Sequence, residues 1–201
     1  MTDNYIKHSI MSDWDERYSR GDYASLEPSP LLGRALELCG AGAGRALDVA
    51  CGAGRHALVL AERGFDVTAV DASRAGVGLL RERARERGLR IDARVADLER
   101  GEFRVEPEAY DLVCDFYYLQ RDLFAALRDG VRPGGLFVAA IHLADGDPHA
   151  RPMNPDFLLR PGELRAHFDG WEILHDRETA GRDTDAGQHT RRSAELIARK
   201  K

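Results

Sequence analysis

The stretch that decides the fold reads Leu47-Asp48-Val49-Ala50-Cys51-Gly52-Ala53-Gly54-Arg55-His56. Its apolar first half predicts a short strand over residues 46–50, and a helical pattern follows over 56–63 and ends at Gly64. Gly52 and Gly54 lack a Cβ, so the backbone of the turn can approach a ligand closely. The first N–H groups of the helix point toward that ligand. The stretch therefore predicts a strand, a binding turn and a helix.

Strands and helices alternate along the chain after this turn. Further strands are expected at residues 65–70, 91–95, 111–116, 136–141, 171–175 and 193–198. Ser73 is typical of a helix N-cap, and Gly88 of a helix end. Pro133-Gly134-Gly135 predicts a tight turn before the fifth strand. The alternation predicts an α/β fold with a doubly wound, seven-stranded, mostly parallel sheet. The last two strands have no helix between them, which predicts an antiparallel C-terminal hairpin.

Composition excludes several classes of protein. The chain has 201 residues, with 29 Lys and Arg against 34 Asp and Glu, so the formal net charge is −5. An acidic chain is not expected to bind nucleic acid. No apolar run reaches the roughly 18–20 residues that cross a bilayer, and the first residues are not typical of a signal peptide. Cys39, Cys51 and Cys114 form no C-x-x-C pair. These features predict a cytoplasmic protein without a membrane partner.

Carboxylates stand where the predicted strands end. The carboxyl ends of parallel strands share one edge of the sheet, and ligands bind there. Asp71 ends the second strand and can accept hydrogen bonds from the two hydroxyls of a ribose. Asp97 follows the third strand, where it can accept from the exocyclic amine of adenine while the Leu98 N–H reaches a ring nitrogen. The pattern predicts a cofactor that contains adenosine.

Two kinds of cofactor fit that pattern. Gly52, Gly54 and Ala57 satisfy the dinucleotide fingerprint G-x-G-x-x-G/A, which is typical of nicotinamide oxidoreductases. Asp48 lies inside the first strand, where dinucleotide-binding proteins normally have an apolar residue, and Asp97 is a further acid. Both residues count against a dinucleotide, but an NAD-dependent oxidoreductase remains an alternative.

Five motifs, in order along the chain, resemble those of the class I S-adenosylmethionine-dependent methyltransferases. They are D-x-x-C-G-x-G at 48–54, A-V-D-A-S at 69–73, V-A-D-L at 95–98, Y-D-L-V at 110–113 and R-P-G-G at 132–135. The likeness covers residues 45–141, and the closing hairpin fits this Rossmann-like fold. W-D-E-R-Y at 14–18 and P-S-P-L-L at 28–32 are similar to the small-molecule branch that includes tellurite-resistance and thiopurine methyltransferases.

The resemblance implies S-adenosyl-L-methionine as the cofactor. It also implies a helical lid over residues 1–33, followed by the methyltransferase domain at 34–201. Trp14 and Tyr18, four residues apart, would share the inner face of that lid. The residues expected to contact the cofactor are Arg17, Tyr18, Asp48, Cys51, Gly52, Gly54, Asp71, Ala72, Asp97, Leu98, Asp115, Phe116 and Arg121.

The acceptor is expected to be a small molecule: a thiol, a metalloid oxyanion or another small metabolite. It would lie beneath the lid and the long loop from His142 to Arg160. An oxygen or nitrogen acceptor needs a general base, and His142 is the first candidate because it ends the fifth strand. Tyr117 is the second catalytic candidate, because an aromatic ring can stabilise a sulfonium cation.

Other expectations concern metals, partners and catalysis. His142, Asp145, Asp147 and His149 lie close in sequence but lack the spacing of ligands on a helix, so no metal is predicted. We expect a monomer or a homodimer. A non-catalytic protein that binds S-adenosylmethionine remains a second alternative.

Overall fold

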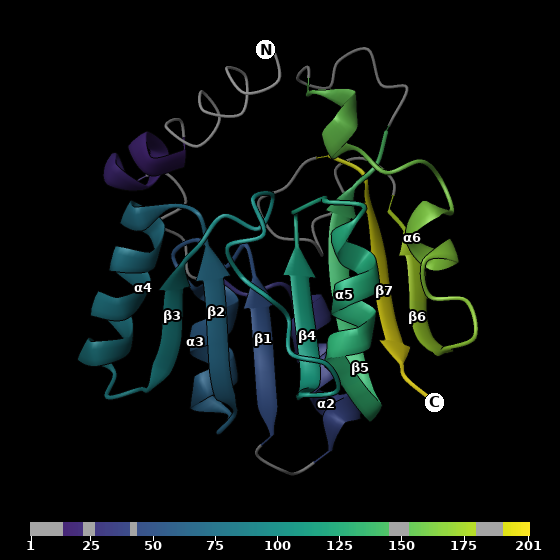
Figure 1. The fold of residues 1–201 in the computed structure, drawn as a ribbon, viewed down its shortest axis with the longest axis horizontal. Coiled ribbons are helices and arrows are strands. Elements are labelled where there is room, and N and C mark those ends of the chain that lie inside the picture. Colours follow the sequence, from purple (N-terminus) through teal and green to yellow (C-terminus); the bar gives the residue numbers. More distant parts are fainter. Residues whose placement is uncertain (1–13, 22–26, 41–43, 145–152, 180–190) are drawn as a thin grey trace.

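Seven strands form one sheet in the order β3-β2-β1-β4-β5-β7-β6 (Figure 1). The computed structural model describes residues 14–21, 27–40, 44–144, 153–179 and 191–201. Strands β1 to β5 pair in parallel, and β7 is antiparallel to β5 and β6. The predicted fold class is therefore confirmed. The strands are β1 Arg45–Val49, β2 Asp66–Asp71, β3 Ile91–Val95, β4 Tyr110–Phe116, β5 Val131–His142, β6 Glu172–Glu178 and β7 Ser193–Arg199.

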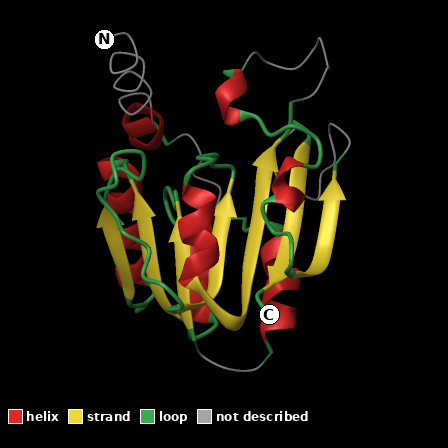
Figure 2. Ribbon diagram, turned by 45° about the vertical axis from the view of Figure 1, so that its right-hand side comes forward, coloured by secondary structure: helices red, strands yellow, loops and turns green. Residues whose placement is uncertain are grey.

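Helices cover both faces of the sheet (Figure 2). One face packs against α2 Pro30–Cys39, α3 Arg55–Glu62 and α4 Arg74–Glu86. The other packs against α5 Leu123–Gly130 and α6 Glu163–Ala166. A short 3-10 helix, η1 Pro155–Phe157, lies between β5 and α6. None of the helices in the described part of the chain is long and apolar enough to cross a membrane.

The boundaries of α4 follow from local chemistry. The Ser73 hydroxyl oxygen accepts a hydrogen bond from the Gly76 amide at 3.0 Å, as expected of an N-cap. Gly88, just past the helix, has φ +66°, a conformation that glycine adopts at little cost. Because Ser73 follows Asp71 so closely, the cap fixes the start of α4 at the carboxyl edge of the sheet.

Two predicted boundaries fall inside a strand or a helix of the structure. The expected turn at 133–135 coincides with an irregularity inside β5 (Val131–His142): the pairing with β4 jumps from Tyr110↔Val131 to Leu112↔Leu136, and Gly134 has φ +80°. The chain continues through it because the Gly134 amide donates to the Lys200 carbonyl and the Lys200 amide donates to the Gly135 carbonyl. The expected lid boundary after residue 33 falls inside α2. Leu31 and Leu32 of this helix are buried in the core.

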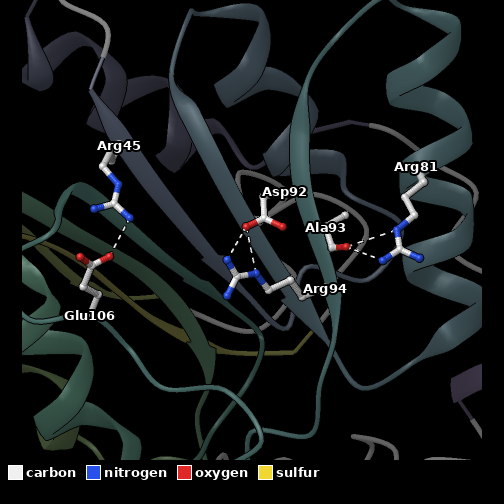
Figure 3. Close-up of polar contacts among 6 residues, drawn as sticks. All are labelled: Arg45, Arg81, Asp92, Ala93, Arg94 and Glu106. Atoms are coloured by element: carbon white, nitrogen blue, oxygen red, sulfur yellow. Dashed lines mark hydrogen bonds and ion pairs between the residues drawn. The ribbon is translucent and has the colours of Figure 1, made fainter.

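Arginines hold the β3 side of the sheet together (Figure 3). The Arg81 guanidinium of α4 donates from Nε and Nη2 to the Ala93 carbonyl of β3, at 3.2 and 2.6 Å. Arg94 pairs with Asp92 within β3. The Arg81 contact fixes α4 against β3 and so positions the wall of the candidate site that α4 supplies.

Candidate cofactor site

Both glycines of the turn between β1 and α3 have backbone conformations that favour glycine. Gly52 has φ +53° and Gly54 has φ +82°, a region in which residues with a Cβ are strained. A Cβ at Gly54 would clash with the Leu80 side chain of α4. Gly54 is the N-cap of α3 and has no side chain to serve as a cap. Asp48 of β1 supplies the missing acceptor, because its carboxylate takes a hydrogen bond from the Ala57 amide in the first turn of α3.

Asp71 ties the end of β2 to this turn. Its Oδ2 accepts from the Gly52 amide at 2.8 Å, and its Oδ1 accepts from the Ser73 amide at 2.7 Å. Burial raises the pKa of the Asp71 carboxyl, and the two amide donors counteract that rise. Each carboxylate oxygen has a second lone pair, so both can still accept from ribose hydroxyls. The structure thus gives Asp71 a role in shaping the turn that the sequence did not show.

Asp48 and Asp115 are two buried carboxyls at the ends of neighbouring strands. They are 1% and 2% exposed. Each has one oxygen held by a backbone amide, that of Ala57 for Asp48 and that of Tyr118 for Asp115. The other oxygens, Oδ2 of Asp48 and Oδ1 of Asp115, accept no hydrogen bond within the described part of the chain. Burial raises the pKa of Asp48 to about 7 and that of Asp115 well above its usual range. Each of these two oxygens can accept a hydrogen bond from an N–H donor that a ligand brings.

A helical segment at 14–19 docks beside the turn. Asp15 Oδ1 accepts from the Ser73 hydroxyl at 2.5 Å and from the Ala75 amide at 3.0 Å. The Trp14 and Tyr18 rings stack with centroids 6.0 Å apart, so the two side chains share one face of the segment, and Trp14 is 38% exposed. The Arg17 guanidinium lies 5.0 Å from the Trp14 ring centroid. A Cβ at Gly52 would clash with the Tyr18 hydroxyl, which places Tyr18 against the glycine turn.

Tyr117 and His142 meet at the ends of β4 and β5. Their ring centroids are 5.0 Å apart, and the Arg55 guanidinium lies 5.4 Å from the Tyr117 ring centroid. Tyr117 has φ +65°, which is strained for a residue with a bulky side chain, and its amide donates to the Ala140 carbonyl at 2.7 Å. Strain of this kind clusters at functional sites. Burial raises the pKa of the Tyr117 phenol to about 12, so it stays protonated at neutral pH.

Asp97, which was predicted to bind adenine, has interaction partners within its own turn. Asp97 is buried, its Oδ1 accepts from the Glu99 amide at 2.9 Å, and its Oδ2 lies 3.2 Å from Arg100 Nε. Leu98 is buried and Ala72 is half-buried. The contacts with adenine and ribose therefore stay predictions.

Three further candidates have structural partners. Burial raises the pKa of the Cys51 thiol, which keeps it neutral. Phe116 stacks on His56 with centroids 3.9 Å apart. Arg121 donates to Glu163 Oε1 at 2.5 Å and to the Leu158 carbonyl at 2.8 Å. These contacts bind Arg121 to residues at and just before the start of α6. They do not connect it to Asp48, Asp71 or Asp115.

Sequence reasoning missed three residues of the site. Asp15 lies within the W-D-E-R-Y motif, but nothing in the motif shows that it reaches α4. Arg55 and His56 follow the glycine turn directly, and only the fold brings them to Tyr117 and Phe116. His56 Nε2 also accepts from the Ser29 amide at 3.2 Å, which joins the start of α2 to the site. Asp145, Asp147 and His149 lie outside the described residues.

Comparison with known proteins defines the class. Residues 46–135 match a methyltransferase domain. Together with the sheet order and the carboxyl edge, this match identifies residues 46–135 as a methyltransferase domain of the class I S-adenosylmethionine-dependent type, whose cofactor is S-adenosyl-L-methionine. It gives no support to the nicotinamide alternative.

Within the class, the chain is similar to tellurite-resistance methyltransferases. It is 28% identical over 170 residues to the probable S-adenosyl-L-methionine-dependent methyltransferase TehB of Haemophilus influenzae, a match over 78% of this chain and 57% of that protein. The crystal structure of TehB superposes with a TM-score of 0.74 at 22% identity, covering 93% of this chain and 67% of that one. Hemagglutinin 1 of Eikenella corrodens is 32% identical over 143 residues, 68% of this chain and 47% of that protein. The chain spans about half the length of these curated relatives.

Proposed function

We propose that this protein transfers a methyl group from S-adenosyl-L-methionine to a small-molecule acceptor. The observation that carries the proposal is the site at the carboxyl edge of a matched methyltransferase domain. There a tight glycine turn, fixed by Asp71, lies beside Asp48 and Asp115, each of which has one oxygen that accepts no hydrogen bond from the described residues. The cofactor supplies an activated methyl group, so the protein's main task is to position donor and acceptor.

The candidate site residues divide into those that would bind the cofactor and those that would face the acceptor. Asp71 would hold the ribose, Asp97 and Leu98 the adenine, and the glycine turn with Asp48, Asp115 and Tyr18 the methionine part. Tyr117 and His142 would face the acceptor. For an oxygen or nitrogen acceptor, the His142 ring would take the proton that the acceptor loses, while the protonated Tyr117 phenol would serve as a hydrogen-bond donor.

Related structures support a small acceptor. One solved relative, with a TM-score of 0.70 and 20% identity over 98% of this chain, is a 1,6-didemethyltoxoflavin-N1-methyltransferase with its substrate bound. Another, with a TM-score of 0.64 and 18% identity over 86% of this chain, is a geranyl diphosphate methyltransferase. A thiol, a metalloid oxyanion and other small metabolites are the candidate acceptors here. We also propose a cytoplasmic monomer or homodimer: the free thiols of Cys39, Cys51 and Cys114 suit a reducing compartment, and the acidic composition counts against a nucleic-acid partner.

Cofactor choice is the first test. Calorimetric titration is expected to show micromolar binding of S-adenosylmethionine and S-adenosylhomocysteine, and no binding of NAD⁺ or NADH. The reason is that buried carboxyls favour the cationic amino-acid part of the methyl donor over a pyrophosphate, which is an anion. Binding of NADH without binding of the methyl donor would refute the assignment.

Turnover is the second test, because a sensor would bind the cofactor without using it. Methyl-labelled cofactor incubated with a panel of thiols, tellurite, selenite and phenols is expected to label at least one acceptor class. His142→Gln should reduce kcat for a phenol or amine acceptor and leave transfer to a thiolate unchanged, since a thiolate carries no proton to remove. Equal loss for both classes would exclude the base role.

We further propose that the segment around residues 14–19 is a lid whose order depends on cofactor. Asp15 and Tyr18 dock it on α4 and the glycine turn, and the core cluster does not include it. Amide hydrogen exchange at residues 14–20 is expected to slow when S-adenosylhomocysteine is added, and Asp15→Ala should speed exchange in both states. Exchange that is equally slow with and without ligand would make the segment a fixed part of the core. N-terminal truncations that test the lid should remove only residues before Ser29, because Leu31 and Leu32 are core residues.

A further inference from the structure

Arg121, in the connection between β4 and α5, donates from all three nitrogens of its guanidinium to the segment that leads into α6. Its Nε and Nη2 donate to the two carboxylate oxygens of Glu163, at 2.5 and 3.2 Å. Its Nη1 donates to the Asp156 carbonyl at 2.9 Å, and Nη2 also donates to the Leu158 carbonyl at 2.8 Å. A guanidinium is planar and presents its donors in a fixed geometry. These bonds therefore anchor residues 156–163 to the β4–α5 connection.

Glu163 completes this anchor at the start of α6. Its Oε2 also accepts from the Arg160 amide at 2.8 Å, so one carboxylate binds both Arg121 and the backbone just before the helix. Burial would raise the pKa of the Glu163 carboxyl, but the hydrogen bonds from Arg121 and from the Arg160 amide bring that pKa below its ordinary value. The carboxylate therefore stays ionised at neutral pH.

The anchored segment is hydrogen-bonded to the end of β5. The Leu159 amide donates to the His142 carbonyl at 2.9 Å, and the Ala144 amide donates to the Leu159 carbonyl at 2.8 Å. Leu159 directly follows Leu158, whose carbonyl accepts from Arg121. Arg121 is thus connected to the backbone of His142, the candidate base, through two neighbouring residues of the segment.

The other acceptor candidate lies on the same connection as Arg121. Tyr117 comes four residues before Arg121, and its ring centroid is 5.0 Å from that of His142. The helix η1, drawn in green beyond the carboxyl end of β5 in Figure 1, has no buried residue. Apolar packing therefore does not fix η1, whereas the bond from Arg121 to the Asp156 carbonyl does.

We propose that Arg121 is a positioning residue for methyl transfer: by anchoring residues 156–163, it fixes the wall of the acceptor site beside Tyr117 and His142. The inference rests on the proposed function. Because its guanidinium nitrogens all donate to protein acceptors, Arg121 acts on the acceptor through this segment. Displacement of a reacting group by about 1 Å can slow a reaction about a hundredfold, so a residue remote from the chemistry can control the rate.

Arg121→Ala tests the proposal by separating acceptor kinetics from cofactor binding. The kcat/KM for an acceptor found with the methyl-labelled panel is expected to fall about tenfold to a hundredfold. The Kd of S-adenosylhomocysteine, measured by calorimetry, should be unchanged, because Arg121 is not connected to the carboxylates of the cofactor site. Arg121→Lys keeps the charge but not the planar fork, so it should restore only part of the acceptor kinetics.

Arg165→Ala is the matched control. Arg165 belongs to α6 and forms an exposed ion pair with Asp176 at 3.8 Å, so its loss should leave acceptor kinetics unchanged. Glu163→Ala should reproduce the loss caused by Arg121→Ala. The double variant should be no worse than either single variant, because the two side chains act as one unit. Losses that add would show that the two side chains act independently, against the proposal.

Amide hydrogen exchange gives a measurement that needs no acceptor. The Leu159 and Ala144 amides are expected to exchange faster in Arg121→Ala than in the wild type, and no faster in Arg165→Ala. Should Arg121→Ala not fold, Arg121→Lys and Glu163→Gln provide the same comparison.

The outcomes distinguish this proposal from the proposed function. Acceptor kinetics equal to those of the wild type overturn the positioning role. An equal loss of cofactor affinity and acceptor kinetics also overturns it, since Arg121 would then support the cofactor site or the whole fold. If the wild-type protein methylates no acceptor, the proposed function fails, and unchanged exchange at Leu159 and Ala144 would separately refute the anchor.

Discussion

Replacing Asp71 with alanine is expected to destabilise the fold and to weaken cofactor binding at the same time. The carboxylate accepts two amide hydrogen bonds, and loss of both leaves the Gly52 and Ser73 N–H groups without their acceptor. Hydrogen bonds to a charged group contribute about 1.5–3 kcal/mol each, so loss of the two is expected to lower the free energy of unfolding by about 3–6 kcal/mol. Cofactor affinity should fall at least a hundredfold, because the ribose acceptor is lost and the glycine turn is released. Urea unfolding and calorimetry measure the two effects.

The matched control is Asp66→Ala, at the exposed first position of the same strand. It should change the free energy of unfolding by less than about 0.5 kcal/mol. It should leave cofactor affinity unchanged. An Asp71→Ala protein that binds the cofactor normally would contradict the ribose role.

Gly52→Ala is expected to have the second largest effect. The backbone at Gly52 has φ +53°, where an L-residue costs about 1–2 kcal/mol. The new methyl group would also clash with the Tyr18 hydroxyl and displace the docked segment. We expect a loss of stability in that range, a drop of tenfold or more in cofactor affinity, and faster amide exchange at 14–20.

Gly78→Ala provides the comparison for that substitution. Gly78 lies inside α4, and a Cβ at this position would have no heavy atom within 4 Å beyond its own helix backbone and chain neighbours. Alanine there should stabilise the helix by about 0.5–1 kcal/mol and leave binding unchanged. If Gly52→Ala behaves like Gly78→Ala, close approach at the glycine turn is not needed.

The sequence predicted the parts of the molecule that depend on local patterns. Periodicity located the strands of the sheet, and the cap at Ser73 was confirmed because a hydroxyl at that position satisfies an amide of the helix it starts. Parallel pairing then required Asp48, Asp71 and Asp115 to share one edge. The class of cofactor followed from that edge and from the motifs.

The features that the sequence did not predict depend on contacts between segments that are distant along the chain. α2 has local start signals, with Ser29 as its N-cap and Pro30 in its first turn, but its place in the core depends on burial of Leu31 and Leu32. Arg121 resembles a site residue in sequence, yet its partner Glu163 lies 42 residues away. Asp71 was expected to act on the ligand alone, because its bonds to the turn form only when β1 and β2 are adjacent.

The Arg81 contact on β3 has a consequence for association. β3 is an edge strand of the sheet, and edge strands present unpaired carbonyls on which a second chain can assemble. The Arg81 guanidinium donates hydrogen bonds to the Ala93 carbonyl and places a positive charge at this edge of the sheet (Figure 3). Two copies meeting there would have to displace that bond and bring like charges together. A homodimer of this protein is therefore expected to use another face, and Arg81→Ala should make the chain more prone to fibrillar aggregation through strand addition.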